Sequence, residues 1–358
     1  MSTEAKPVRT LSLCLIVKNE ETFLPECLSF ASGVADEIIV VDTGSTDRTI
    51  EIAERHGARI IHHQWTDHFA QARNISLAAA TMDFILVLDA DERLAPGTAE
   101  VIRELIDAES ENAPPTVYLP LIENVDAQGR GLGADHMPRL WRRRPEMVFT
   151  GRIHERLGVG VSNLRLAYED RFRIIHLGYD PGIAEARGKR ARNRALLEQD
   201  LAERPDDPVV RYYLAKEHYA TGDDEAALEG FLAVVADGTI LNQALSAYLF
   251  GAECLRALGR PLEGMKLALD GTRKAPDYGE LWFSAGRSAL EAGRPAQAEA
   301  QLERGTLIPK GIAATAFRDP SVAAWQADLV RAQAVLAQRD YERAAHLFDA
   351  VRPQLPET

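Results

Sequence analysis

The stretch Phe84-Ile-Leu-Val-Leu-Asp-Ala-Asp-Glu92 joins five apolar residues to a cluster of three carboxylates. A short, continuous apolar run bounded by polar residues is typical of a fully buried strand. Two carboxylates separated by one residue at a strand end can both approach one divalent cation, which would bridge them to a diphosphate and neutralise its charge. Asp89 and Asp91 are therefore candidate metal ligands, because three acidic residues rarely follow a buried strand merely for solubility.

The residues before this stretch repeat the same pattern of apolar strand and polar turn. Leu11–Val17 and Glu37–Val41 are apolar runs that end in Lys18-Asn19 and Asp42-Thr43. Such alternation predicts a Rossmann-like α/β domain, with a mostly parallel sheet and helices on both faces, whose ligands bind at the carboxyl ends of the strands. A further strand is expected at 58–62, and helices are expected at 23–30, 48–56 and 70–80.

A second motif, Val40-Val-Asp-Thr-Gly-Ser-Thr-Asp47, lies at one of these strand ends. An Asp in the first turn after a parallel strand can accept hydrogen bonds from a ribose hydroxyl or a base N–H. Gly44 permits a tight turn, and the residues after it can cap the next helix. For Ser45, Thr46 and Asp47, helix capping alone explains the residue as well as ligand binding does. For Asp42, capping explains the residue less well than ligand binding.

The chain changes character twice beyond these motifs. Strands are expected at 117–122 and 172–175, with arginine-rich and glycine-rich connections between them. From about Pro181 the strand patterns disappear, and Ala, Leu, Glu and Arg dominate. We therefore expect an α/β domain over residues 1–180 and an all-α domain over residues 181–358.

The all-α part is repetitive. A small residue is followed seven positions later by a turn residue, and five positions after that by another small residue. Small residues spaced in this way let two antiparallel helices pack closely, as in tetratricopeptide repeats, although any antiparallel helical bundle is the competing interpretation. A longer last step predicts an insertion near Pro309–Pro320. The four units are Ala215/Gly222/Ala227, Ala252/Gly259/Gly264, Gly286/Gly293/Ala298 and, more weakly, Ala332/Arg339/Ala344.

Bulk properties exclude several classes of protein. The 358 residues carry a formal net charge of −13, which disfavours a nucleic-acid partner. No apolar run reaches the roughly 18 residues that a membrane span needs. Three cysteines without a C-x-x-C spacing suggest neither a disulfide framework nor a zinc site. These properties are those expected of a cytoplasmic protein.

Residues 10–93 resemble the nucleotide-binding half of a family 2 glycosyltransferase with the GT-A fold. Three linked segments carry the resemblance: LSLCLIVKNEE, EIIVVDTGSTDRT and FAQARNISLAAATMDFILVLDADE. The chain also resembles a bacterial subgroup of peptide S-glycosyltransferases and lipopolysaccharide-core glucosyltransferase-like proteins. The features that carry this resemblance are the sequence VDTGSTD, the residues Trp65 and Phe69 before Ala72-Arg73-Asn74, and the repeats. The family usually has a second Asp where this chain has Thr43, so one nucleotide contact is lost or replaced.

The resemblance implies a role for each matching residue on the donor side. Asp42 would contact the nucleoside, with Val17 and Lys18 near the base. Arg73 would lie beside the phosphates or the sugar of the donor. Asp91 would be the main metal ligand, while Asp89 would act on the sugar–ribose side or through water.

The resemblance also implies a general base and a late histidine. Family members place an acidic base at the start of a helix, and Gly151-Arg-Ile-His-Glu155 is the matching segment, with Glu155 preferred and His154 as the alternative base. For His154 a core histidine is the competing interpretation. His176, at the end of a short apolar strand, would coordinate the metal. The alternative is that it contacts a carbonyl. Imidazole suits Mn²⁺ better than Mg²⁺, so the expected cofactor is Mn²⁺ or Mg²⁺.

An arginine cluster follows in the same region. Arg139 and Arg152 are expected to face the site and to clamp the donor diphosphate or an acidic acceptor. Arg142–Arg144 are expected to pair with surface carboxylates instead, and Arg187–Arg194 to form the solvated face of a connecting helix. The adjacent His62 and His63 suit no common metal spacing and are taken as structural.

The leading hypothesis is therefore an inverting, metal-dependent transferase that uses a nucleotide sugar, with UDP-glucose or UDP-N-acetylglucosamine as the donor expected of the family. The acceptor is a peptide, a protein or a saccharide, and the repeats could bind a peptide or form a homodimer. One alternative is a non-catalytic repeat scaffold with a degenerate front domain. Another is a sugar nucleotidyltransferase, which Lys18-Asn-Glu-Glu21 argues against because those enzymes carry a glycine-rich loop there.

Overall fold

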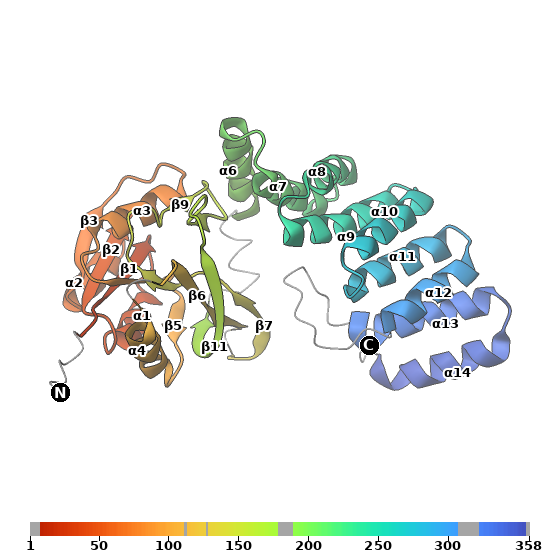
Figure 1. Cartoon of the computed structure of the whole chain (residues 1–358), viewed down its shortest axis with the longest axis horizontal. Coiled ribbons are helices and arrows are strands. Elements are labelled where there is room, and N and C mark those ends of the chain that lie inside the picture. Colours follow the sequence, from red (N-terminus) through yellow and green to blue (C-terminus); the bar gives the residue numbers. More distant parts are fainter. Residues whose placement is uncertain (1–7, 111–112, 127, 178–188, 307–321, 356–358) are drawn as a thin grey trace. The chain divides into compact units, whose positions relative to one another are not determined.

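The chain forms two compact units, Met1–Leu196 and Leu197–Thr358, in a computed structural model (Figure 1). The structure describes residues 8–355 with gaps at 111–112, 127, 178–188 and 307–321. The domain boundary expected at residues 180–181 and the insertion expected at Pro309–Pro320 lie outside the described residues. Helix α6 (Lys189–Glu203) begins in the first unit and ends in the second.

The first unit is built on a nine-stranded sheet. Its order is β3-β2-β1-β4-β8-β6-β11-β5, and β7 pairs with β6 outside this path. A separate two-stranded sheet joins β9 and β10. The strands are β1 Leu11–Val17, β2 Glu37–Asp42, β3 Arg59–His62, β4 Phe84–Val87, β5 Glu92–Leu94, β6 Thr116–Val125, β7 Gly131–His136, β8 Leu140–Arg142, β9 Phe149–Thr150, β10 Arg156–Leu157 and β11 Arg165–His176.

The sheet is parallel in its first half and mixed in its second. The expected strands β1 to β4 are confirmed, and β2–β3, β1–β2 and β1–β4 pair in parallel. Beyond β4 the sheet is largely antiparallel, because β8 pairs antiparallel with both β4 and β6, although β6 and β11 run parallel. The carboxyl ends of β1, β2 and β4 therefore meet at one edge, as the sequence predicts.

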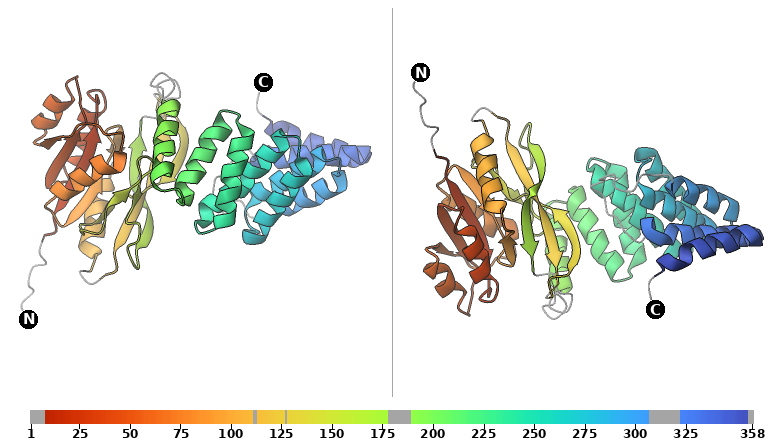
Figure 2. Two further views of the ribbon diagram at one scale, coloured as in Figure 1. Left: turned by 90° about the horizontal axis from the view of Figure 1, so that it is seen from above. Right: turned by 90° about the horizontal axis from the view of Figure 1, so that it is seen from below.

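Helices cover both faces of this sheet (Figure 2). The odd-numbered residues of β1 pack with helices α1 (Leu24–Ala31), α2 (Thr49–Arg55) and α4 (Thr98–Ala108) in one hydrophobic core. Cys14, which points to the other face, packs in a second core with helix α3 (Phe69–Ala79) and the aromatic residues of β8 and β9. The period-two alternation of the strand thus divides one buried run between two cores.

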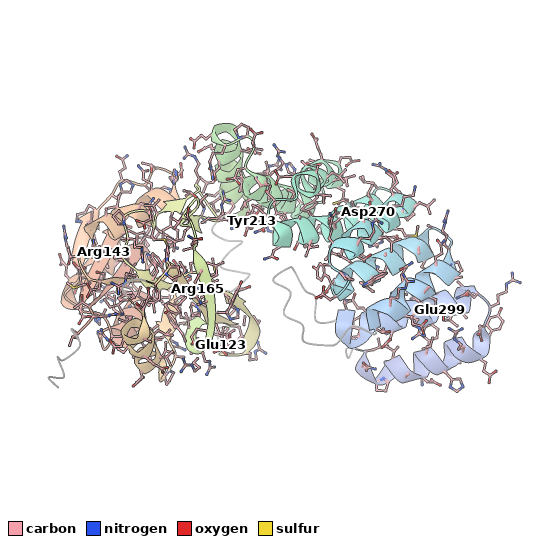
Figure 3. All side chains as sticks on the ribbon, in the orientation of Figure 1. Glu123, Arg143, Arg165, Tyr213, Asp270 and Glu299 are labelled. Atoms are coloured by element: carbon pink, nitrogen blue, oxygen red, sulfur yellow. The ribbon has the colours of Figure 1, made fainter. Side chains whose placement is uncertain are left out.

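Strand β11 closes the unit by pairing with both β6 and β5. It runs parallel to β6, where Arg165 and Glu123 mark opposite ends of the pair (Figure 3), and a register shift lies between Glu169 and Arg173. On its other side β11 pairs antiparallel with β5, so that His176 lies opposite Glu92. This pairing brings the end of the domain next to the turn that follows β4.

The second unit consists of helical hairpins (Figure 1). A π-helical turn η1 (Val322–Gln326) precedes the fourth hairpin of the described residues, and a 3₁₀ turn η2 (Arg352–Gln354) follows it. Neighbouring helices pack in chain order, as expected for tetratricopeptide-like repeats. The hairpins are α7 Pro208–Ala220 with α8 Asp224–Asp237, α9 Leu241–Ala257 with α10 Pro261–Lys274, α11 Gly279–Glu291 with α12 Pro295–Thr306, and α13 Ala327–Ala337 with α14 Tyr341–Val351.

The expected turn and packing residues of the repeats are confirmed. All four turn residues have positive φ: Gly222 at 75°, Gly259 and Gly293 at 71°, and Arg339 at 65°. Where the helices meet, a Cβ on Gly264 would lie 2.9 Å from the Ala252 carbonyl oxygen. The close approach of helices in these hairpins therefore depends on small residues.

Within the part of the chain that the structure describes, no helix is both long and apolar enough to cross a bilayer.

Candidate functional site

The loops after β1 and β2 are joined by hydrogen bonds into one rim at the carboxyl edge of the sheet. Asn19, which has a positive φ of 57°, accepts from the backbone N–H of Thr46 at 2.8 Å and donates its own N–H to the Ser45 hydroxyl at 3.0 Å. Glu20 donates its N–H to the Thr49 hydroxyl at 2.7 Å. The chain's own hydrogen bonds therefore join the two loops.

Asp42 is buried in this rim, with 3% of its surface exposed. Its carboxylate accepts from the backbone N–H groups of Gly44 (3.2 Å) and Ser45 (3.0 Å), and His62 Nδ1 lies 3.5 Å away. These bonds hold the loop after β2 and do not cap helix α2, which begins at Thr49. Of the residues proposed as caps, Asp47 accepts the Thr49 N–H at 2.9 Å. The two carboxylate oxygens of Asp42 offer about four acceptor positions, so a nucleoside contact is compatible with both backbone bonds.

Val17, Lys18 and Thr43 lie next to Asp42 in the same rim. The Val17 side chain is buried in the core, and its carbonyl accepts from both the N–H (2.9 Å) and the hydroxyl (3.0 Å) of Thr43. Thr43 thus has a structural role where the family has an Asp. Lys18 is exposed directly after the strand, and it can reach a ligand on the rim.

Beyond β4 the chain turns tightly through Asp89–Glu92, with the Glu92 N–H donating to the Asp89 carbonyl at 3.0 Å. Glu92 is buried, and its carboxylate accepts the Asp89 N–H at 3.0 Å. It also binds Arg139 through Nε (3.0 Å) and Nη2 (2.6 Å). Glu92 therefore fixes both the turn and the arginine, a role that the sequence analysis did not assign to it.

Asp89 lies between two arginines. Its Oδ1 accepts from Arg73 Nη2 at 2.7 Å and its Oδ2 from Arg139 Nη2 at 3.1 Å. Arg73 Nε also donates to Glu155 Oε1, so that Glu155, Arg73, Asp89, Arg139 and Glu92 form one alternating chain of charges. Such charge-assisted bonds are geometrically restrictive, because each guanidinium presents its donors in a fixed planar array.

The charges in this network shift one another's pKa. Burial raises the pKa of Asp89, but the charges of Arg73 and Arg139 outweigh it and hold that pKa below its ordinary value. Burial raises the pKa of Glu92, and the Asp89 charge adds to this, so that the net shift is upward despite Arg139. Asp89 is thus an anion held by two cations. Each of its oxygens accepts one of these bonds and keeps a second lone pair that faces no arginine.

Asp91 and His176 form a separate pair at the same turn. His176 Nε2 lies 3.4 Å from Asp91 Oδ2, while Nδ1 lies 2.7 Å from Asn124 Oδ1. An amide oxygen can only accept, so Nδ1 carries the proton. Burial lowers the pKa of His176, but the hydrogen bond and charge of Asp91 outweigh it, and the net shift is upward.

Asp91 and His176 are side chains of the types that ligate divalent cations. Asn124 orients the imidazole in the way that outer-shell partners orient metal-binding histidines, and Nε2 then faces the carboxylate. Among the described residues, no three His, Cys, Asp or Glu side chains gather as a complete metal site. A cation here would therefore need further oxygen ligands from a diphosphate or water, as Mg²⁺ and Mn²⁺ commonly do.

Glu155 reaches the site from the segment between β9 and β10. This segment is not helical, in contrast to the helix start that the family resemblance implies, and Glu155 comes directly before β10. Its side chain is 13% exposed and bonds Arg73. His154, with a positive φ of 51°, is exposed, so the interpretation of His154 as a core histidine is wrong.

The expectation that Arg142–Arg144 pair with surface carboxylates is wrong, because Arg142 Nε lies 3.9 Å from the buried Glu109 and both Arg143 and Arg144 donate to backbone carbonyls. Arg152 lies beside the start of α3, where its carbonyl accepts the Phe69 N–H at 2.8 Å and its Nη1 donates to the Asp67 carbonyl at 3.2 Å. Arg142 pairs with Phe84 at the far end of β4, away from the rim. Arg143 Nε there donates to the Met82 carbonyl at 2.7 Å.

Two contributors to the site were missed from the sequence, Glu92 and Asn124. Glu92 belongs to the quoted acidic run, but a carboxylate in such a run gives no indication of whether it binds a ligand or an arginine. Asn124 lies near the end of β6 without a motif around it. Its importance follows from the β6–β11 register, which places it opposite His176.

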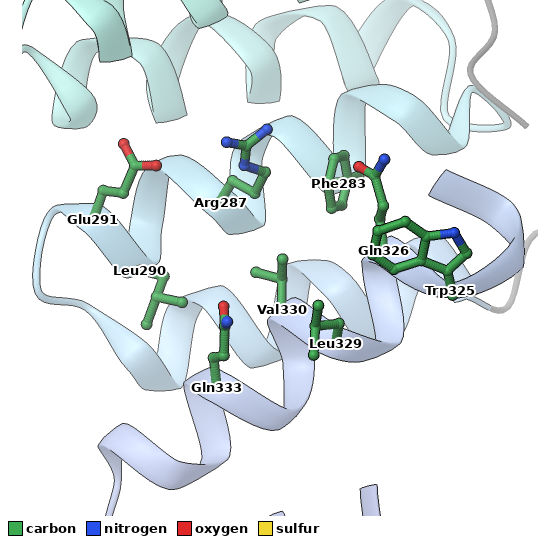
Figure 4. A pocket seen from close by; sticks show the side chains of 9 residues that line it. All are labelled: Phe283, Arg287, Leu290, Glu291, Trp325, Gln326, Leu329, Val330 and Gln333. Carbon is green, nitrogen blue, oxygen red and sulfur yellow. The ribbon is translucent and has the colours of Figure 1, made fainter. Parts of the chain in front are cut away.

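A cavity of about 340 Å³ lies within the second unit (Figure 4). Its walls come from α11, η1 and α13, and they combine apolar and aromatic side chains with two amides and one charged residue of each sign. The lining residues are Phe283, Arg287, Leu290, Glu291, Trp325, Gln326, Leu329, Val330 and Gln333.

Comparison with known proteins gives matches for both parts of the chain. A family model described as "Glycosyl transferase family 2" matches residues 12–172. A "TPR repeat-containing protein" of Synechococcus elongatus is 36% identical over 225 residues, which cover 61% of this chain and 54% of that protein. The "SPbeta prophage-derived glycosyltransferase SunS" of Bacillus subtilis is 26% identical over 228 residues, which cover 63% and 53%.

The chain thus spans about half the length of these curated relatives. Among solved structures, a MamA protein is similar with a TM-score of 0.40 and 14% identity, over 48% of this chain and 86% of that chain.

Proposed function

We propose, from the premise that residues 12–172 belong to glycosyl transferase family 2, that this chain transfers a sugar from a nucleotide diphosphate sugar to an acceptor. One observation carries the proposal: Arg73 binds Asp89 through one nitrogen and Glu155 through another. One guanidinium thereby holds Asp89, the proposed contact of the sugar donor, and Glu155, the proposed base for the acceptor.

On the donor side, Asp42 and the backbone of the rim would bind the nucleoside, for which we propose uridine. Arg73 and Arg139 would lie beside the diphosphate and the sugar. Arg73 Nη1 is buried without a hydrogen-bond partner among the described residues, so it keeps an unused donor. Asp89, held by both arginines, would contact the sugar or ribose rather than the metal.

Asp91 and His176 would hold Mn²⁺ or Mg²⁺. The cation would neutralise the negative charge that develops on the departing nucleoside diphosphate. The chain's own contribution is orientation, since Asn124 fixes the imidazole and Glu92 fixes the turn that presents Asp91.

On the acceptor side, Glu155 would take the proton from the attacking nucleophile, and the sugar would be transferred with inversion. Arg73 keeps the Glu155 carboxylate oriented toward the donor side of the site. The exposed His154 is the alternative base. A peptide, protein or saccharide is proposed as the acceptor, and the cavity of the repeats, with its apolar and polar lining, would suit a peptide side chain.

The test is hydrolysis of UDP-glucose and UDP-N-acetylglucosamine by the purified chain, with Mn²⁺ or Mg²⁺ and with chelator. We expect metal-dependent release of UDP, and we expect Asp91→Ala to abolish it without changing the unfolding temperature. The matched control is Asp107→Asn, on the helix α4. Full activity in chelator would contradict the metal role.

Two alternatives make predictions that separate assays can test. A non-catalytic scaffold would show no saturable binding of UDP in the presence of Mn²⁺. A sugar nucleotidyltransferase would release pyrophosphate from a nucleoside triphosphate and a sugar phosphate.

A further inference from the structure

The side-chain amide of Asn74 makes two hydrogen bonds to the backbone of Phe149. Its Nδ2 donates to the Phe149 carbonyl at 2.9 Å, and its Oδ1 accepts the Phe149 N–H at 2.8 Å. An amide side chain presents a donor and an acceptor side by side, as a neighbouring strand would. Asn74 therefore acts as a one-residue strand partner for β9.

These bonds anchor the segment that carries Glu155. Strands β9 and β10 pair through Thr150 with Arg156 and through Phe149 with Leu157. Glu155 immediately precedes β10, so the position of its backbone follows from the position of β9. The turn between the strands contains two residues of positive φ, Gly151 at 108° and His154 at 51°, which restrict the path of the chain.

Helix α3 holds the same segment at three points. Asn74 binds Phe149 at the start of the segment. The Phe69 N–H donates to the Arg152 carbonyl, in the middle of the segment, at 2.8 Å. Arg73, the residue before Asn74, binds the Glu155 side chain at its end. The Arg73 guanidinium also lies 5.6 Å from the centre of the Phe149 ring.

The Phe149 backbone depends on Asn74 because Phe149 is buried, with 6% of its surface exposed. Its side chain packs edge-on against Trp141, with ring centroids 6.0 Å apart. Loss of the amide would leave a buried N–H and a buried carbonyl without partners, which is costly unless the strand moves to reach water. Movement of the strand would displace Glu155.

We propose that Asn74 is a positioning residue, which acts through the Phe149 backbone to place Glu155 for activation of the acceptor. This inference rests on the proposed function. The residue does not touch the donor, so its loss reduces turnover while leaving nucleotide binding intact.

The experiment compares Asn74→Ala and the isosteric Asn74→Asp with wild type in the full chain. Asn74→Asp keeps an acceptor for the Phe149 N–H but places a carboxylate oxygen against the Phe149 carbonyl. The probes are Mn²⁺-dependent hydrolysis of UDP-glucose, in which water takes the place of the acceptor, and binding of UDP with Mn²⁺. Gln71→Ala is the matched control, because this exposed amide of the same helix bonds Thr66 instead.

We expect kcat to fall by about 10- to 100-fold in both Asn74 variants, since a displacement of about 1 Å can cost 10²-fold. The KM for UDP-glucose and the Kd for UDP should stay within twofold, and Gln71→Ala should match wild type. Amide hydrogen exchange should become faster over residues 149–157 and stay unchanged over 89–92. A merely structural role would instead change Kd, KM and kcat together.

Two results would overturn the inference: an unchanged exchange rate over residues 149–157 in both variants, or a kcat within twofold of wild type. Absence of hydrolysis by wild type would contradict the proposed function and, with it, the catalytic part of the inference. Hydrogen exchange would then still decide whether Asn74 holds the segment. The two failures are therefore distinguishable.

Discussion

Buried charges at the sheet edge depend on one another more than on solvent. Glu92 is 3% exposed and binds Arg139, which in turn binds Asp89. Removing one partner of a buried ion pair leaves the other as an uncompensated charge, which costs far more than the loss of an exposed pair. Loss of a single member of the network is therefore expected to destabilise the turn.

We expect Glu92→Ala to lower the free energy of unfolding by about 3 kcal/mol. The reason is that Arg139 would stay buried with one carboxylate in place of two. Chemical denaturation monitored by circular dichroism measures the change. Glu104→Ala, which removes the exposed pair with Arg171, is the control and should cost less than about 1 kcal/mol. Equal effects of the two substitutions would show that the buried network is not stabilising.

The three cysteines, Cys14, Cys27 and Cys254, are free and buried. Burial raises the pKa of the Cys14 and Cys254 thiols to about 12, and burial together with nearby carboxylates raises that of Cys27 as well. Because the thiolate is the reactive form, we expect no rapid reaction with Ellman's reagent in the native protein and three reactive thiols after unfolding. A fast-reacting thiol in the native protein would contradict this burial.

At the scale of elements, the turn residues of the repeats provide a test of local strain. Arg339 occupies the left-handed conformation that Gly222, Gly259 and Gly293 occupy in the other hairpins. A side chain in this conformation costs roughly 1–2 kcal/mol, which glycine avoids.

We therefore expect Arg339→Gly to raise the free energy of unfolding of the second unit by about 1 kcal/mol. The measurement is the midpoint of urea unfolding. Arg352→Gly is the matched control, because Arg352 has a φ of −48° and gains nothing from glycine there. A stabilisation of equal size in both variants would mean that strain at Arg339 is not the cause.

The elements that could be predicted from sequence are those whose pattern is local. The apolar run of β1 and the spacing of Leu24, Cys27, Leu28 and Ala31 in α1 identify these elements without any partner. Strand β7 could not be predicted, because Gly131–His136 is mostly exposed and lacks alternation. The pairing of Asp91 with His176 depends on β5 lying against β11, which no short pattern encodes. Glu92 was missed for a similar reason, since its partner Arg139 is distant in sequence.

At the scale of the whole molecule, the two units have separate hydrophobic cores. The first contains the two cores of the sheet, and the second contains clusters such as that of Phe231 and Phe250. Units with their own cores can unfold separately, so a single unfolding temperature need not describe the chain.

We expect UDP with Mn²⁺ to raise the unfolding temperature of the first unit and leave that of the second unchanged. Ligand that binds one unit stabilises that unit by about 2.7 kcal/mol at 100 times its dissociation constant. Differential scanning calorimetry can separate the transitions, and Arg339→Gly identifies the second unit by shifting its transition alone. A ligand shift of equal size in both transitions would show that the units unfold together.

The antiparallel contact of β5 with β11 has a consequence for the order in which the chain is made. Residues 11–87 contain β1 to β4, so this half of the sheet can assemble on the ribosome as soon as those residues emerge. The turn that carries Asp91 must wait until the strand that ends at His176 has been translated. A nascent chain halted shortly before that point would therefore hold the folded rim of β1 and β2 but lack the Asp91–His176 pair.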